Sequence, residues 1–150
     1  MHTGALLVLL SLTPAPSPAS AQSPGDRHGD SKEKVTGIGG LFFRAKDPHA
    51  LSRWYLTHLG IAPVPTSYEG TPWRQEAGPT IFAPFPDTTR YFGRPEQGWM
   101  VNFRVRNLDA ITGQLKAAGI AVQVDPKEYP NGPFARLHDP EGNPIEPWEP

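Results

Sequence analysis

The sequence predicts an α+β domain in which one structural unit, a strand, a helix and then up to three strands, is used twice. Three observations support this prediction. Segments near residues 41 and 101 repeat each other, each begins with alternating apolar residues and continues as an amphipathic helix, and each precedes short β-prone runs separated by turns. Helices on one side of a mixed sheet would leave the opposite side free to line a site.

The composition fits one domain and excludes several kinds of site. A chain of 150 residues, 37% of them hydrophobic, is large enough for one core and too small for two ordinary ones. The formal net charge of -1 gives no excess of positive charge that would indicate binding to nucleic acid or an anionic membrane. The absence of cysteine excludes disulfides, thiolate metal sites and cysteine nucleophiles. A neutral or mildly anionic small molecule remains open as a partner.

The N-terminal segment is expected to lie outside the folded domain. Residues 1–21 combine an apolar run, too short to span a bilayer, with a small-residue ending at Ala19, Ser20 and Ala21. This pattern is typical of a secretory signal peptide, so we expect an exported protein, periplasmic or secreted. A disordered extension or a misassigned start codon is the alternative, because no Lys or Arg precedes the apolar run. Residues 22–34 have no large apolar residue and are expected to be a flexible linker.

The repeat aligns LFFRAKDPHALSRWYLTHLGI, residues 41–61, with VNFRVRNLDAITGQLKAAGI, residues 101–120. Strand, cap, helix and stop signals recur in the same order, which chance rarely supplies. The matched positions are, in order, Phe43 with Phe103, Arg44 with Arg104, Asp47 with Asn107 and Gly60 with Gly119.

Each copy predicts one strand and one helix. Residues 41–45 and 101–105 alternate so that one face of each strand is apolar. Asp47 and Asn107 are good N-cap residues, and a glycine ends each helix. One stripe of each helix is apolar and should pack on the apolar strand faces. These stripes are Leu51, Trp54, Tyr55 and Leu59 in the first copy, and Leu108, Ile111, Leu115 and Ala118 in the second.

Further strands are expected after each helix. In the second copy they cover residues 121–124, 134–138 and 144–148, with the turn sequences YPNGP and DPEGN between them. The corresponding runs of the first copy are fainter and cover residues 64–68, 73–76 and 80–85. Residues 84–99 are expected to be an ordered loop, rich in Pro and Gly, in which Tyr91 and Phe92 can be buried.

The order and spacing of these segments resemble the vicinal oxygen chelate superfamily, which includes glyoxalases, bleomycin-resistance proteins and extradiol dioxygenases. The resemblance rests on GIGGLFFRAKDPHALSRWYLTHLGI, WMVNFRVRNLDAITGQLKAAGI and FARLHDPEGNPIEPWEP, and it covers residues 35–150. It implies a glyoxalase-like domain of two βαβββ modules, residues 35–92 and 93–150, forming a curved mixed sheet with a cup-shaped cavity. Whether such modules pair within one chain or across a homodimer stays open.

The resemblance also implies positions for a divalent metal, which fall on Gly40, Phe82, Met100 and Glu146. Glycine has no side chain, phenylalanine has no lone pair and a thioether suits soft metals. One remaining carboxylate does not hold Zn, Mg or Mn. A divalent metal is therefore disfavoured, and we expect no cofactor.

Glu146 is the most informative residue of the last expected strand. The strand period places it with Trp148 on the face opposite Ile145, and so toward the cup. It can pair with Arg44, Arg104 or Arg136 because a buried carboxylate needs compensation. A purely structural ion pair, a general base for proton abstraction and a metal ligand remain as alternatives.

Two functions follow from these expectations. The first is a small-molecule binding protein of the glyoxalase/bleomycin-resistance type, without the family's metal. The alternative is a lyase or isomerase of a small oxygenated substrate that uses Glu146 as general base. The repeated arginines, Arg44 and Arg104, would suit an anionic ligand group, but they could instead reach solvent. His138 could act as a general acid or base, or it could be solvated. The residues expected to line the ligand site are Phe42, Arg44, Met100, Asn102, Arg104, Arg136, His138 and Trp148.

Overall fold

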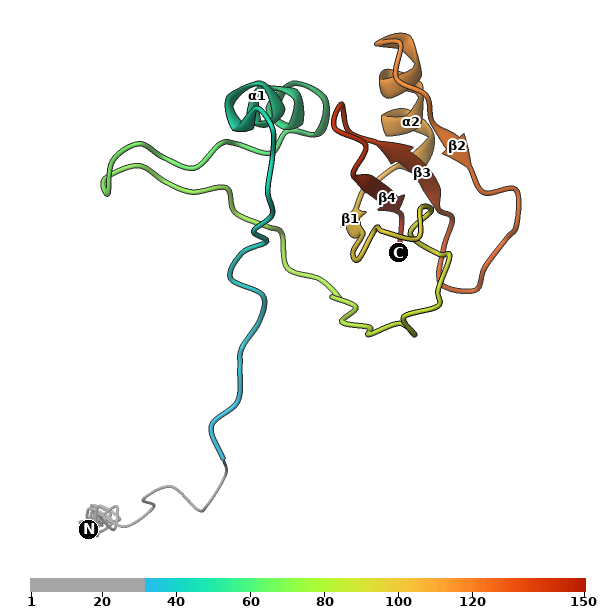
Figure 1. The fold of residues 1–150 in the computed structure, drawn as a ribbon, viewed down its shortest axis with the longest axis horizontal. Helices are drawn as coiled ribbons and strands as arrows, with labels where there is room; N and C mark the ends of the chain where they lie inside the picture. The colour runs from blue at the N-terminus through green and yellow to red at the C-terminus, as the bar shows by residue number, and fades with distance from the viewer. Residues whose placement is uncertain (1–31) are drawn as a thin grey trace, which may run out of the picture. The chain divides into compact units, whose positions relative to one another are not determined.

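The computed structural model describes residues 32–150. The chain divides into two units, residues 1–41 and 42–150. The expected signal peptide, residues 1–21, and most of the expected linker lie outside the described residues, and residues 32–41 contain no helix or strand. The second unit carries the regular elements shown in Figure 1. They are α1 (Pro48–Leu59), β1 (Val101–Arg104), α2 (Leu108–Ala117), β2 (Gln123–Val124), β3 (Ala135–His138) and β4 (Pro144–Trp148).

The strands form a mixed sheet in the order β1-β4-β3-β2. β1 runs parallel to β4, whereas β3 is antiparallel to both of its neighbours. A crossover through α2 joins β1 to the rest of the sheet, as a parallel pair requires. The predicted α+β class is therefore confirmed at the level of a four-stranded mixed sheet with two helices.

Both helices begin at the predicted N-cap residues. The Asp47 side chain accepts a hydrogen bond from the backbone N–H of Ala50 at 2.9 Å, and Asn107 accepts from Ala110 at 2.7 Å. Gly60 ends α1 with a φ of 69°, the left-handed conformation that glycine adopts without strain. Among the described residues, no helix combines the length and the apolar character needed to cross a membrane.

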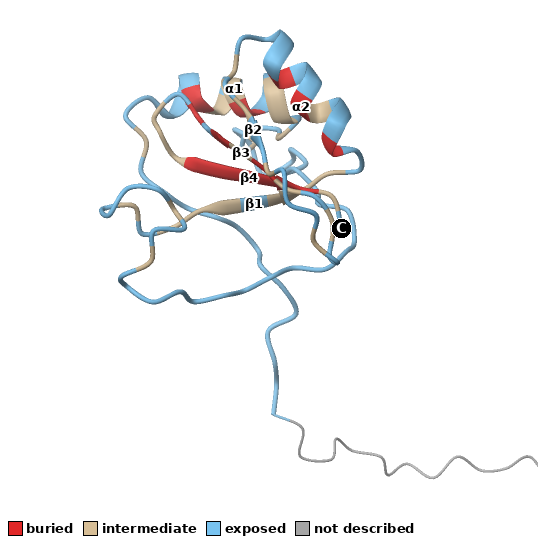
Figure 2. Ribbon diagram, turned by 90° about the vertical axis from the view of Figure 1, so that its right-hand side faces the viewer, coloured by how far each residue is buried: buried red, intermediate tan, exposed pale blue. Residues whose placement is uncertain are grey.

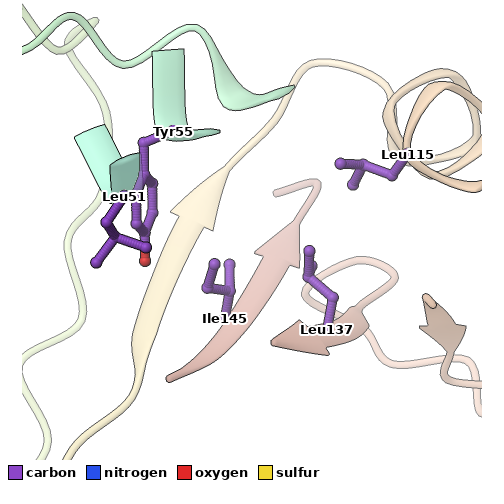
Figure 3. Packing of buried hydrophobic residues seen from close by; sticks show 5 residues of the cluster. All are labelled: Leu51, Tyr55, Leu115, Leu137 and Ile145. Carbon is purple, nitrogen blue, oxygen red and sulfur yellow. The ribbon is translucent and has the colours of Figure 1, made fainter. Parts of the chain in front are cut away.

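The core lies between the two helices and one face of the sheet (Figure 2). Figure 3 shows its buried centre, where α1 and α2 meet β3 and β4. This centre is made of Leu51, Tyr55, Leu115, Leu137 and Ile145. Val101 and Phe103 of β1 pack against it, which confirms the predicted packing of helix stripes on the apolar face of the second repeat's first strand.

The first repeat differs from the prediction. Residues 41–45, 64–68, 73–76 and 80–85, expected as strands, contain none in the structure, so only α1 represents that repeat among the regular elements. A strand forms when a neighbour pairs with its backbone, and these segments have no such neighbour in the described chain. Their apolar residues are also exposed, as Phe42 at 93% and Phe82 at 87% show.

Candidate functional site

Glu146 lies on β4, a central strand of the sheet, and its side chain is 5% exposed. Alternation along β4 sends Ile145, 0% exposed, to the helix-covered core and Glu146 to the opposite face. The register places Asn102 of β1 directly beside Glu146. Leu137 pairs with Ile145, which places Arg136 of β3 on the other side of the carboxylate. Strand pairing therefore brings three polar side chains into one row across the sheet.

Three side chains donate hydrogen bonds to the Glu146 carboxylate. The Tyr91 hydroxyl donates to Oε1 at 2.8 Å, and the Asn102 side-chain amide donates to Oε2 at 2.9 Å. The Arg136 guanidinium donates to Oε1 at 3.3 Å and supplies the compensating charge. We call these four residues the Glu146 cluster. A buried carboxylate costs several kcal/mol when it is left alone, on the order of 2 to 5, and these donors offset that cost.

Tyr91 reaches the cluster from the segment that joins the two repeats. Its ring lies against the Arg136 guanidinium, with 4.1 Å between the guanidinium carbon and the ring centroid, and its carbonyl oxygen accepts from Arg136 at 3.1 Å. Burial raises the pKa of the Tyr91 phenol, and its hydrogen bond to Glu146 raises this pKa further. The phenol is therefore held as a neutral proton donor.

The cluster remains accessible on the side of β1 and the joining segment. Asn102 is exposed, and Tyr91 is 38% exposed, although the carboxylate between them is buried. A molecule that approaches from solvent meets these two side chains first. The cluster can therefore offer a carboxylate, an amide and a guanidinium to a ligand, provided that Tyr91 moves.

Arg136 is the arginine that pairs with Glu146, and the two other candidates lie elsewhere. Arg104 donates to the carbonyl oxygen of Glu76 at 2.7 Å, and its guanidinium lies so close to Gly78 that a methyl group there would overlap it. Arg44 is exposed. The repeated arginine pair of the sequence therefore does not form a two-cation site around Glu146 in the described structure.

The remaining expected ligand residues are divided between the sheet and the surface. Trp148 is 6% exposed, stacks on Phe134 at 5.9 Å and donates from its indole nitrogen to the carbonyl oxygen of Asn131 at 2.6 Å. Its contacts thus order the loop before β3. Met100 is partly buried, whereas Phe42 and His138 are exposed.

A separate cavity of about 760 Å³ is lined by residues from the C-terminal end of α2, β2 and β3. Arg136 and His138 border it, and Glu146 does not. It therefore does not give a ligand direct access to the carboxylate, and the contacts of the Glu146 cluster are the better guide to a binding site.

The turn that precedes β4 carries a second buried carboxylate with a structural role. Asp139, which is 4% exposed, accepts hydrogen bonds from the Tyr55 hydroxyl at 3.0 Å and from the Asn143 side chain. Burial raises the pKa of the Tyr55 phenol, and the nearby Asp139 carboxylate adds to this rise. The neighbouring Glu141 accepts from the backbone N–H groups of Lys46 and Asp47 at 2.8 and 2.9 Å. The DPEGN turn therefore attaches the start of α1 to the hairpin of β3 and β4.

The donor set around Glu146 does not fit a divalent metal. Both carboxylate oxygens already accept hydrogen bonds, and one of the donors is a cation that would repel a metal ion. Within residues 32–150, no three His, Asp or Glu side chains come together as a metal-binding group would require.

Sequence reasoning missed Tyr91 as a member of the site. It noted Tyr91 and Phe92 only as aromatic residues that a loop could bury. The contact with Glu146 spans 55 positions, and no periodic pattern predicts a contact from an irregular segment. The local signal that could have identified Tyr91 was the pair of aromatic residues, Tyr91 and Phe92, inside a connection rich in Pro and Gly.

The family model described as glyoxalase-like domain matches residues 40–146. No curated protein matches the chain significantly. Solved structures are also similar to parts of this chain. The chain is 31% identical to a glyoxalase/bleomycin resistance protein from Streptomyces sp. CB03234, with a TM-score of 0.32, 35% of this chain covered and 46% of that one. It is 30% identical to a glyoxalase family protein from Bacillus anthracis, with a TM-score of 0.32 and coverage of 35% and 43%.

The third is an antibiotic binding protein, also from Streptomyces sp. CB03234, at 23% identity, with a TM-score of 0.46 and coverage of 70% and 88%. The match spans less than half the length of the first two structures.

Proposed function

Because the chain belongs to the glyoxalase-like domain family, whose model matches residues 40–146, we propose that it binds a small organic molecule at the Glu146 cluster without a divalent metal. The observation that carries this proposal is the environment of the carboxylate. Glu146 is buried although it lies on the face opposite the core, so its charge needs polar partners, and solvent reaches two of these partners, Asn102 and Tyr91.

The cluster has the elements of a recognition site. The Glu146 carboxylate accepts a hydrogen bond from a ligand, and the Asn102 amide can donate or accept beside it. The guanidinium of Arg136 offers a flat cationic surface to a planar group, as its contact with the Tyr91 ring illustrates. Fixed polar groups of this kind orient a ligand, and they need no metal to do so.

A screen of small molecules by thermal shift tests this function. Ligands that raise the melting temperature of the parent protein should have a much smaller effect on Glu146→Gln, because the variant lacks the carboxylate acceptor. Glu69→Gln makes the same chemical change on an exposed residue and should respond like the parent. A ligand that stabilises the parent and Glu146→Gln equally would place its binding site elsewhere.

The alternative function is that of a lyase or isomerase with Glu146 as general base. A base must accept a proton from the substrate, and three donors now engage its two oxygens. Binding is therefore the better supported function. The feature that favours proton transfer is the Tyr91 hydroxyl, which lies 2.8 Å from Oε1 of Glu146. Turnover of a bound molecule by the parent, absent from Glu146→Gln, would replace the binding proposal with the catalytic one.

The proposal extends to residues 35–92, which contain the first repeat and form their own βαβββ module when they pair across a homodimer. Its supporting observation is the exposure of apolar residues in segments with strand-like sequences, including Phe42, Ile81 at 69% and Phe82. Sedimentation should then show a dimer that Phe82→Asp weakens. A monomer at every concentration would contradict this part.

A further inference from the structure

The phenol of Tyr91 occupies the Glu146 cluster as a ligand would. Its hydroxyl donates to the carboxylate at 2.8 Å, its ring lies 4.1 Å from the Arg136 guanidinium carbon, and its carbonyl accepts from the same guanidinium at 3.1 Å. The phenol of Tyr91 thus uses both the Glu146 acceptor and the cationic surface of Arg136. A side chain of the protein itself therefore occupies the position that a ligand would take.

The segment that carries Tyr91 is attached to the sheet by few contacts. Residues 84–99 contain no helix or strand. Phe85 stacks on the Tyr91 ring at 5.1 Å but is itself 43% exposed, and Arg94 donates to the carbonyl of Gly142 at 3.4 Å. Segments with few buried contacts and no backbone ladder open at low cost. Tyr91 can therefore leave the cluster while the sheet stays folded.

We infer that the Glu146 cluster selects neutral, planar hydroxy-aromatic molecules, and that the Tyr91 phenol is the internal competitor that such a ligand replaces. This inference rests on the proposed binding function and names its ligand class. A hydroxyl group is required because Glu146 only accepts hydrogen bonds as a carboxylate. An aromatic ring is required because the Arg136 guanidinium lies over the face of the Tyr91 ring, with its carbon 4.1 Å from the ring centroid.

The charges of the cluster exclude other classes. An anionic ligand that reached the Tyr91 position would meet the Glu146 carboxylate, and an organic cation stacked on Arg136 would meet the guanidinium. An aromatic ether of the same shape keeps the ring but has no proton to donate, so the buried acceptor would lose its partner. The hydroxyl group is therefore the discriminating feature.

Competition with Tyr91 makes a specific prediction about affinity. When the binding-competent state is only a fraction of the population, the apparent dissociation constant rises by the inverse of that fraction. Tyr91→Phe keeps the ring against Arg136 but removes the donor to Glu146, so the open state becomes more populated. Hydroxy-aromatic ligands should then bind the variant more tightly than the parent, by about tenfold.

The experiment measures by calorimetry the binding of 2-naphthol, 2-methoxynaphthalene and 2-naphthoate to the full chain. The parent should bind 2-naphthol at least about tenfold more tightly than either analogue, because only the naphthol donates to the carboxylate. Tyr91→Phe should bind 2-naphthol more tightly than the parent. Tyr68→Phe removes a fully exposed phenol and should bind it as the parent does.

The ligand series on the parent keeps the inference testable even if Tyr91→Phe is unstable. Equal affinity for 2-naphthol and its methyl ether would overturn the ligand class, and weaker binding of 2-naphthol to Tyr91→Phe would make Tyr91 a contact rather than a competitor. Absence of 2-naphthol binding would also overturn the inference. A different result would overturn the proposed function itself: every ligand found for the parent, of whatever class, would bind Glu146→Gln with the same affinity.

Discussion

Arg136 and Glu146 form an ion pair whose two members differ strongly in exposure. The guanidinium is 42% exposed and the carboxylate 5%, with 3.3 Å between Nη2 and Oε1. Solvent screens the arginine, so its charge contributes less than that of a fully buried partner. The two neutral donors, Tyr91 and Asn102, therefore provide an essential part of the compensation for the buried carboxylate.

The first prediction is that Glu146→Gln lowers the free energy of unfolding by about 1 to 3 kcal/mol. The glutamine keeps the size of the side chain but loses the negative charge, and its NH₂ group replaces one of the two oxygens that now accept from three donors. Urea unfolding monitored by tryptophan fluorescence measures the change. Glu69→Gln, on an exposed residue, should leave the stability within about 0.5 kcal/mol of the parent. A Glu146→Gln variant as stable as the parent would show that the pair has no structural role.

The second half of the chain was largely predictable because its signals are local. The prediction for β4 has the bounds that the structure shows, 144–148, and strand alternation assigned Ile145 to the core and Glu146 to the other face. Both N-caps were also assigned correctly, since a short polar side chain before an apolar stripe has one common use.

The errors arise where the outcome depends on distant neighbours. Residues 80–85 have a sequence compatible with a strand, but strand formation also needs a partner that a sequence pattern does not specify. The arginine partner of Glu146 could not be chosen from the sequence, since three arginines shared the same face in the expected sheet. The register that pairs Leu137 with Ile145 decides in favour of Arg136.

The second prediction concerns two glycines with opposite requirements. Gly132 has a φ of 103°, and a Cβ there would overlap the carbonyl oxygen of Glu149, so Gly132→Ala should destabilise the protein by about 2 kcal/mol or more. Gly113 lies in α2 with open space around it, and Gly113→Ala should stabilise the protein by about 0.5 to 1 kcal/mol. Thermal unfolding of the two variants provides the comparison. Equal effects would contradict the assigned backbone of the loop before β3.

The third prediction is that metal removal leaves stability unchanged. The Arg136 guanidinium already pairs with the Glu146 carboxylate, so we expect no metal binding energy to be linked to folding at this site. Protein dialysed against EDTA should have the same melting temperature as protein supplied with Zn²⁺ or Mn²⁺. A stoichiometric metal in protein purified without added metal, together with a fall in melting temperature on chelation, would contradict the proposed metal-free site.

The fourth prediction is a loss of stability at alkaline pH that depends on Tyr55. Burial raises the pKa of this phenol above its ordinary value of 10.0, and Asp139 at 3.0 Å adds to the rise. Above that value the unfolded chain has released the proton and the folded chain still holds it. The stability is therefore fully present below pH 10.0 and is lost as the pH rises through the folded pKa, by up to about 1.4 kcal/mol per pH unit.

Urea unfolding at intervals from about pH 8 to 11 measures this loss of stability, because the loss begins near the unfolded pKa, and Tyr55→Phe assigns the loss to Tyr55. Tyr55→Phe should have a shallower decline than the parent, even though its stability at neutral pH is lower because Asp139 loses a donor. Tyr68→Phe should decline as the parent does, because Tyr68 is fully exposed. Parallel curves for the parent and Tyr55→Phe would mean that the Tyr55 phenol ionises equally in the folded and unfolded states, and would contradict the rise of its pKa on burial beside Asp139.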